Sequence, residues 1–228
     1  MIHFGLLLFP QITQLDLTGP AEVWSRCPDS QVHLIWKDRN PVDTSSGFQI
    51  SPTTSFSDCP DLDVLCVPGG AGQTLLMEDL ETLEFIRRQA NQAKFVTSVC
   101  TGSLLLGAAG LLQGYQATCH WMSLDQLSLF GAIPSSQRVV KDRNRISGGG
   151  VTAGIDFGLS VAAELFGEAV ARRIQLTIEY APEPPFDSGT PQSAGPELVE
   201  DLLERGRASQ AVRLKASQDA AAKLGKLD

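Results

Sequence analysis

The chain has 228 residues, of which 43% are hydrophobic and 19% are charged, a composition typical of a globular protein with one substantial core. Its formal net charge of −8 argues against a nucleic acid partner, and no apolar run reaches the length of a membrane span, so we expect no membrane association. The five cysteines lack CxxC spacing and the three histidines lack HxxxH spacing, which predicts neither a disulfide framework nor a metal centre and favours a reducing, cytoplasmic setting.

The first predicted element is a strand over residues 2–9, a continuous hydrophobic run typical of a strand buried on both faces of a parallel sheet. This run has no basic region before it and leads into a turn at Pro10, so we interpret it as a strand and not as a signal peptide. A helix is expected from about Leu17, with Pro20 in its first turn, and a second strand over residues 32–36. Residues 41–61, rich in Ser, Thr, Pro and Asp, are expected to hold short extended pieces and turns.

A glycine-rich loop follows the next predicted strand. Residues 63–67 form a buried strand that leads into Pro-Gly-Gly-Ala-Gly at 68–72, and such a loop can present backbone N–H groups to an anion. The loop lacks both GxGxxG spacing and a Walker A lysine, so it does not predict a dinucleotide or nucleoside triphosphate site. Residues 78–93 have the pattern of an amphipathic helix with its charges on the outer face.

The most informative stretch is residues 95–112. It begins with a β-branched run typical of a buried strand and continues as a small-residue and Leu-rich run typical of a buried helix, which Gly114 is expected to end. Cys100 stands where the strand gives way to the helix, so we predict it at a tight nucleophile elbow. Unpaired N–H groups at the helix start favour a thiolate, and we therefore expect the pKa of Cys100 to fall below its ordinary value. An inert, buried thiol is the competing interpretation.

The chain continues as short strands and helices around a glycine-dense turn at residues 148–154. In order, we predict a strand over 116–121, a helix over 123–130, a hairpin over 139–147, an apolar helix over 155–166 and another helix over 167–180. Strands and helices alternate throughout, which predicts an α/β fold: a doubly wound, mostly parallel sheet with helices on both faces.

The C-terminal part departs from this pattern. Residues 181–196 are too rich in Pro and Gly for regular structure and are predicted to form an extended arm. Residues 197–227 are expected to form a polar, Ala-rich helix whose apolar stripe is too narrow for stability without a partner surface. We therefore divide the chain into an α/β domain, residues 1–180, and an arm and helix, residues 181–228, which we expect to pack on a second subunit of a homodimer.

The expected topology brings the chemically informative pieces to one edge of the sheet. In doubly wound sheets, ligands bind beyond the carboxyl ends of the strands. That edge gathers Asp16 after the first strand, the glycine-rich loop at 69–72, Cys100 at the elbow and the glycine-dense turn at 148–152.

Four motifs resemble those of the ThiJ/PfpI superfamily. They are Leu-Asp-Leu-Thr-Gly-Pro-Ala-Glu-Val at 15–23, Val-Pro-Gly-Gly-Ala-Gly at 67–72, Val-Cys-Thr-Gly-Ser at 99–103 and Gly-Gly-Gly-Val-Thr-Ala-Gly-Ile-Asp at 148–156. The resemblance extends from residue 2 to about residue 185, and within the superfamily the motifs are most similar to those of bacterial isocyanide hydratases. It implies a flavodoxin-like fold of the ThiJ/PfpI type, similar to class I glutamine amidotransferases, and a homodimeric assembly.

The resemblance implies the hydration of an organic isocyanide to an N-substituted formamide, a lyase reaction without a metal or organic cofactor. Carried over to this sequence, Cys100 is the nucleophile that forms a thioimidate, Asp16 is its acid–base partner and Thr101 is a hydrogen-bonding neighbour. Gly149 and Val151 fall at the positions that flank the thiolate, with the Val151 amide as its expected donor.

Other residues have more than one interpretation. Backbone N–H groups of Gly70 and Ala71 are candidates to stabilise developing charge. Asp16 is either an N-cap of the helix after it or a carboxyl that shares one proton with the nearby thiol, because two neighbouring anions disfavour each other. His120 is either a proton shuttle or a buried histidine bonded to backbone, and we favour the second interpretation; Cys119 is expected on the opposite side of the same strand and inert.

Several other functions share parts of this pattern. A glyoxalase or deglycase acting on small carbonyl compounds would use the same cysteine, but those members carry Glu where this chain has Asp16. Protease-like members carry His directly after the cysteine, where this chain has Thr101, which disfavours peptide hydrolysis. AraC-type regulators have a similar ligand-binding domain, but we expect no DNA binding because too few residues follow the arm for a helix-turn-helix domain. A thiol redox sensor is a further alternative.

Overall fold

The computed structural model describes residues 1–225, and its centre is a seven-stranded sheet in the order β10-β11-β7-β6-β1-β2-β5. All neighbouring strands are parallel except β10 and β11, which form the predicted hairpin. The predicted doubly wound α/β fold is therefore confirmed. The strands of this sheet are β1 (Ile2–Leu7), β2 (Ser30–Trp36), β5 (Thr54–Ser55), β6 (Val64–Val67), β7 (Phe95–Val99), β10 (Val139–Asp142) and β11 (Arg145–Gly148).

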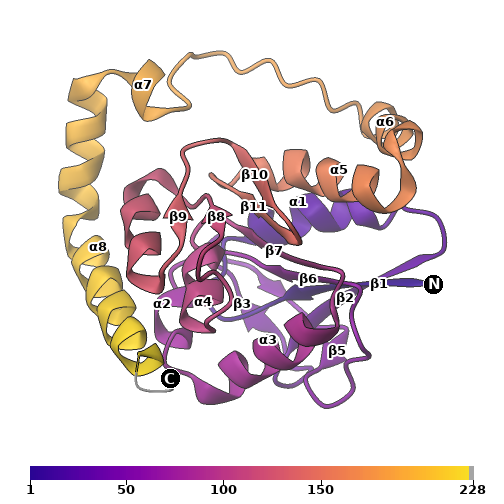
Figure 1. Ribbon diagram of the computed structural model, residues 1–228. Coiled ribbons are helices and arrows are strands. Elements are labelled where there is room, and N and C mark those ends of the chain that lie inside the picture. Colours follow the sequence, from indigo (N-terminus) through magenta and orange to yellow (C-terminus); the bar gives the residue numbers. More distant parts are fainter. Residues whose placement is uncertain (226–228) are drawn as a thin grey trace.

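Helices cover both faces of the sheet, with α1 and α5 side by side on one face and α3 on the other (Figure 1). The helices are α1 (Gln14–Trp24), α2 (Gln73–Leu76), α3 (Leu80–Gln92), α4 (Gly102–Ala108), α5 (Ala153–Phe166), α6 (Glu168–Thr177), α7 (Pro191–Ala194), α8 (Pro196–Leu224) and the 3₁₀ helix η1 (Trp121–Phe130). Two small two-stranded sheets complete the described residues: β3 (Val42–Asp43) with β4 (Gln49–Ile50), and β8 (Gln116–Ala117) with β9 (Ile133–Pro134).

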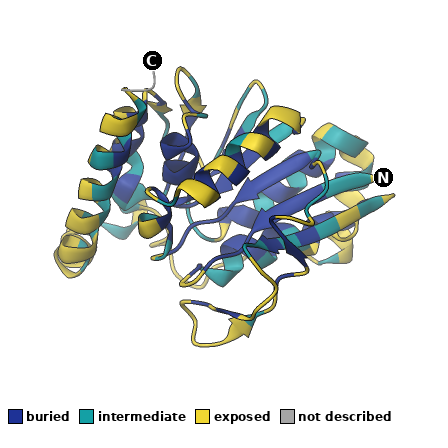
Figure 2. Ribbon diagram, turned by 90° about the horizontal axis from the view of Figure 1, so that it is seen from below, coloured by how far each residue is buried: buried dark blue, intermediate teal, exposed yellow. Residues whose placement is uncertain are grey.

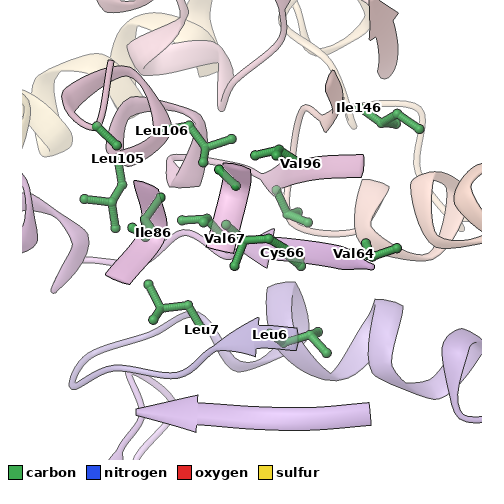
Figure 3. Packing of buried hydrophobic residues seen from close by; sticks show 14 of the residues in the cluster. Leu6, Leu7, Val64, Cys66, Val67, Ile86, Val96, Leu105, Leu106 and Ile146 are labelled. Atoms are coloured by element: carbon green, nitrogen blue, oxygen red, sulfur yellow. The ribbon is translucent and has the colours of Figure 1, made fainter. Parts of the chain in front are cut away.

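The core follows from the apolar strands. Every residue of β6 is buried, as expected of a strand covered on both faces. Side chains of β1, β6 and β7 lie together with those of α3 and α4 (Figure 3), and buried residues occupy the middle of the molecule while exposed ones line the outer helix faces (Figure 2). Trp24 of α1 stacks on Phe4 with ring centroids 4.9 Å apart and donates from Nε1 to the Gly158 carbonyl at 3.0 Å, which joins α1 to β1 and α5.

Some predicted boundaries were wrong, for local reasons. The helix after Cys100 ends at Ala108, because Gly110 has a φ of +78° and the next amide bonds back to the carbonyl of Leu106 at 3.0 Å. Gly114 therefore does not end it. The strand predicted over 116–121 has only two residues, because the chain then turns into η1.

The first helix also begins earlier than expected, at Gln14, so that Pro20 lies inside it and not in its first turn. One turn of helix, α7, forms within the predicted arm, because Thr190 and Ser193 make a reciprocal capping box. Residues 181–190 are otherwise exposed coil.

Helix α8 packs against its own domain, along the side of the molecule where α2, α4 and η1 lie (Figure 1). Ser217 is fully buried and donates to Gln126 of η1 at 2.9 Å, and Lys223 pairs with Glu78 at 2.8 Å. The domain thus supplies a partner surface for the second half of this narrowly amphipathic helix. Its predicted end at residue 227 lies outside the described residues. None of the helices within residues 1–225 is both long and apolar enough to cross a lipid bilayer.

Candidate active site

Cys100 occupies a strained turn between β7 and α4. Its φ is +56°, a left-handed backbone conformation that costs a residue with a side chain about 1–3 kcal/mol. The turn is fixed on both sides: the Cys100 amide donates to the Gly148 carbonyl at 2.9 Å, and Gly102 lies so close to Val67 that any Cβ would overlap the Val67 carbonyl oxygen. The strand-to-helix turn predicted from the sequence is therefore present, with the geometry of a nucleophile elbow.

Asp16 lies beside this turn, fully buried. It is the third residue of α1, whose N-cap position belongs to Thr13, so its interpretation as a helix cap was wrong. The Asp16 carboxylate reaches across to the glycine-rich loop instead, where Oδ2 accepts from the Gly69 amide at 2.9 Å. Oδ1 is buried without a hydrogen bond of good geometry among residues 1–225, and the Cys100 thiol is the nearby donor whose interaction favours the ionised carboxyl.

The electrostatics of this pair differ from the sequence prediction. Burial raises the pKa of Asp16 to about 7, against smaller opposing effects of the Gly69 amide and the Cys100 thiol. Burial and the neighbouring Asp16 carboxyl also raise the pKa of Cys100 well above 9, although the Thr101 amide and the Arg213 charge oppose this. The expected low thiol pKa was therefore wrong for this structure, because desolvation outweighs the helix-terminal N–H groups. At neutral pH the pair holds at least one proton.

Thr101 joins the elbow to the glycine-rich loop. Its hydroxyl oxygen accepts from the Gly70 amide at 3.1 Å, and its own amide interacts with the Cys100 sulfur. A side chain at Gly69 would stand 2.6 Å from the Thr101 nitrogen, so only glycine permits this approach. The Gly70 amide is thus already bonded and Ala71 is exposed. A role for these two residues in charge stabilisation stays a prediction.

The turn before α5 flanks Cys100 on the other side. The Gly149 amide donates to the Arg138 carbonyl at 2.9 Å, so it is directed away from the thiol, and Val151 is half-buried. Arg138 in turn donates to Asp156 of α5 at 2.6 and 2.9 Å. These contacts fix the turn against Arg138 and α5, and the bond from the Cys100 amide to the Gly148 carbonyl joins it to the elbow. The expected Val151 amide–thiolate contact stays a prediction.

His120 follows the short β8 strand and lies at the N-cap of η1. Its Nδ1 accepts from the Met122 amide at 3.4 Å, and burial together with the Arg213 charge lowers its pKa. These observations favour the interpretation as a neutral histidine bonded to backbone. The expectation that Cys119 and His120 alternate along one strand was wrong, because the strand ends at Ala117.

Two residues near the site were missed by the sequence analysis. Arg213 of α8 lies close enough for its charge to favour the Cys100 thiolate, and Gln73, the first residue of α2, is fully buried just after the glycine-rich loop. A signal for Arg213 was present: with Gly206, Gln210, Ser217 and Ala220 it repeats at helical spacing on the face of α8 that packs on the domain. Within residues 1–225, no three His, Cys, Asp or Glu side chains are arranged to hold a metal ion.

This arrangement suits addition chemistry at a small, electron-poor carbon. A buried thiol supplies the nucleophile, and a carboxyl with a pKa of about 7 beside it can take the thiol proton and return it elsewhere. The site lies beyond the carboxyl ends of β1, β6 and β7, the edge predicted from the topology.

Comparisons with known proteins show the family to which this chain belongs and the proteins to which it is similar. The model of the DJ-1/PfpI family matches residues 5–164. The chain is 58% identical over 223 residues to a Pseudomonas putida protein named isonitrile hydratase, with 98% of each chain covered. It is 33% identical over 184 residues to the transcriptional regulator GbdR of Pseudomonas aeruginosa, covering 77% of this chain and 50% of that one. A solved ThiJ/PfpI family protein from Pseudomonas syringae superposes with a TM-score of 0.91 at 43% identity, covering 96% of this chain and 90% of that chain.

Proposed function

Because this chain belongs to the DJ-1/PfpI family, we propose that it is an isocyanide hydratase, an enzyme that adds water to an organic isocyanide and releases an N-substituted formamide. The observation that carries this proposal is its 58% identity, over 98% of both chains, to the isonitrile hydratase of Pseudomonas putida. The buried pair of Cys100 and Asp16 supports it, because it provides a nucleophile and a proton carrier side by side.

In the first step we assign Cys100 as the nucleophile. Its sulfur bonds to the terminal isocyanide carbon while Asp16 takes the thiol proton and delivers it to the same carbon, which gives a thioimidate bound to Cys100. A carboxyl with a pKa of about 7 is suited to both halves of this transfer. Thr101 holds the glycine-rich loop against the elbow and its amide faces the sulfur, so it supports the nucleophile.

In the second step water adds to the thioimidate carbon. Asp16, again ionised, takes a proton from the water and delivers it to the imine nitrogen, and the resulting tetrahedral adduct breaks its carbon–sulfur bond. The hydroxyl proton of the adduct, which is the second proton of the added water, passes to the sulfur as the formamide leaves, and the thiol of Cys100 is restored. Atoms and charges balance with water as the only co-substrate.

The test of this function is a comparison of two substrates with the purified protein. We expect a simple aryl isocyanide to be converted to its formamide, detected by absorbance and by mass spectrometry, and methylglyoxal to give no lactate. A buried Asp in place of the longer Glu of glyoxalase-like members is the structural reason. Lactate production without formamide production would replace the proposal by a glyoxalase function.

We further propose that the chain forms a homodimer through its C-terminal segment, residues 181–228. Within that segment Phe186 of the arm is 77% exposed, and α8 leaves apolar side chains uncovered although its other face packs on the domain. The exposed apolar residues of α8 are Leu198, Leu202, Leu203, Val212 and Leu214. A second copy that covers them would explain their exposure.

The five free thiols support a cytoplasmic location.

A double substitution tests this assembly. We expect the full chain to be dimeric by light scattering at micromolar concentration, and Leu198→Glu with Leu202→Glu to dissociate it, because two charges would enter an apolar contact. Leu80→Glu, at a 68% exposed position of α3, is the matched control and should leave the dimer intact. A full-length chain that is monodisperse and monomeric would contradict the assembly.

A further inference from the structure

Most buried polar side-chain atoms without a hydrogen-bond partner belong to residues of α1, α2 and α8, of which α2 and α8 both pack on α4, the helix that follows Cys100. Five such side-chain atoms occur among residues 1–225, and four of them belong to Asp16, Gln73 and Arg213. The fifth is the hydroxyl of Thr82 in α3. Buried polar groups in folded proteins are nearly always paired, so a cluster of unpaired ones indicates a place that receives a ligand.

Gln73 reaches this cluster from the glycine-rich loop. Its backbone N–H donates to the Gly70 carbonyl at 3.3 Å. The backbone N–H of Gly70 donates to the hydroxyl of Thr101, next to Cys100, at 3.1 Å. Gln73 is fully buried, yet neither the oxygen nor the nitrogen of its carboxamide has a partner within residues 1–225. A carboxamide in such a position offers two donors and one acceptor.

Arg213 reaches the same region from α8. Its Nη1 donates to the Gln210 side-chain oxygen at 3.0 Å once the Gln210 carboxamide is oriented by its neighbours, and Gln210 then donates to Ser123 at 2.9 Å. The Arg213 Nε is buried and unpartnered, and no carboxylate within residues 1–225 lies at ion-pair distance from this guanidinium. Its Nη1 also lies 3.4 Å from the Ser123 hydroxyl of η1, and its charge affects the pKa of Cys100, Cys119 and His120.

The helix that carries Arg213 is held firmly over the site. Gly206 lies against the Met122 side chain, Gln210 and Arg213 contact Ser123, and Ser217 contacts both Gln126 and Met77, the residue that follows α2. Helix α8 therefore bridges η1 and α2 (Figure 1), the elements that start near Cys119 and after the glycine-rich loop. A charged group held in this way does not have the freedom of a surface arginine.

We infer that Arg213 and Gln73 form a subsite for a carboxylate on the substrate, so that the enzyme prefers isocyanides that carry an anionic substituent over neutral ones. An arginine Nε–H and a carboxamide N–H₂ are donors to which a carboxylate can bind, and the guanidinium supplies the compensating positive charge. This inference rests on the proposed function and names the substrate class for the same site.

The kinetic test compares isocyanoacetate with its methyl ester. We expect the wild-type enzyme to prefer the carboxylate, and Arg213→Met to lower the ratio of kcat/KM for the carboxylate to that for the ester by about 10–100-fold. Both substrates lose the charge that favours the Cys100 thiolate, but only the carboxylate also loses a charged hydrogen bond. Gln73→Leu should act in the same direction more weakly. The matched controls are Arg205→Met, which removes an exposed arginine of α8, and Thr82→Val, which removes the fifth unpartnered atom, in α3; neither should alter the preference.

A binding measurement separates failure of this inference from failure of the proposed function. N-formylglycine, the hydration product of isocyanoacetate, should bind to the wild-type protein more tightly than its methyl ester by calorimetry, and Arg213→Met should abolish the difference. The subsite would be overturned, and the proposed function kept, if the wild-type enzyme hydrated the ester as well as isocyanoacetate and bound N-formylglycine no more tightly than its methyl ester. Arg213-dependent binding of N-formylglycine by a protein that hydrates no isocyanide would keep the anion subsite and overturn the proposed reaction.

Discussion

The Cys100→Ser enzyme is expected to lose isocyanide hydration by more than about 10⁴-fold while keeping its fold. A serine hydroxyl fits the same strained turn, with its φ of +56°, because it differs from the thiol by one atom. It is a far weaker nucleophile, and a carboxyl with a pKa of about 7 cannot deprotonate it to a useful extent. Removing the nucleophile typically lowers the rate about as much as removing all the catalytic residues that act with it.

The matched control for this substitution is Cys119→Ser. Cys119 is also buried, at 3% exposure, and burial raises the pKa of its thiol to about 12. It follows β8, and the Asp16 carboxyl acts on it only as a charge and not through a hydrogen bond as it does on Cys100, so its loss should change turnover by less than about threefold. Steady-state assays with an aryl isocyanide and thermal melts of both variants measure the two effects. An equal loss of turnover in Cys100→Ser and Cys119→Ser would contradict the assignment of Cys100 as the nucleophile.

Asp16→Asn is expected to lower turnover by about 10²–10⁴-fold, the range typical of a general acid–base group. The amide has nearly the shape of the carboxyl and can keep the bond from the Gly69 amide, but it cannot carry a proton from sulfur to carbon. In the wild type, the reactive pair holds one proton, so kcat/KM should rise with pH through about 7, the pKa of Asp16. The variant should lose this pH dependence. A near wild-type rate would reduce Asp16 to a structural residue.

Asp16→Asn is expected to raise the stability of the fold at high pH, although it lowers turnover. The pKa of Asp16 is about 7 in the folded chain and near 3.8 when unfolded, so the folded state binds more protons between these values. Its contribution to stability is therefore fully present below pH 4 and is lost as the pH rises to 7, by up to about 4 kcal/mol. Asp16→Asn should remove this loss and melt at a higher temperature than the wild type at pH 8. An unchanged slope of melting temperature against pH would contradict the buried, proton-holding carboxyl.

The fold and the position of the site could be predicted because both depend on local patterns. The change from a β-branched run to a small-residue run marks the elbow at Cys100, and buried strands followed by loops place Asp16 and the glycine-rich loop at one edge. The interpretation of Asp16 as a cap failed because helix α1 begins before it, at Gln14, with Thr13 at the N-cap position.

What could not be predicted depends on contacts between distant segments. The thiol pKa of Cys100 rises because the surrounding core excludes water, and the sequence around the elbow shows the favourable helix N–H groups but not the burial. Arg213 lies 113 positions after Cys100 on a helix that was expected to serve a second subunit. Its helical spacing indicates the face of α8 that is packed, but not that this face packs on η1, which brings the Arg213 charge to the thiol.

The covalent intermediate gives the most direct test of the proposed chemistry. Protein mixed with an aryl isocyanide and quenched within one turnover should show, by intact-mass spectrometry, a mass increase equal to that of the whole isocyanide, because thiol addition expels no group. Peptide mapping should place it on Cys100, it should be absent from Cys100→Ser, and it should decay as formamide appears. Formamide formation at the full rate with no adduct at any time, and undiminished in Cys100→Ser, would contradict nucleophilic catalysis by this residue.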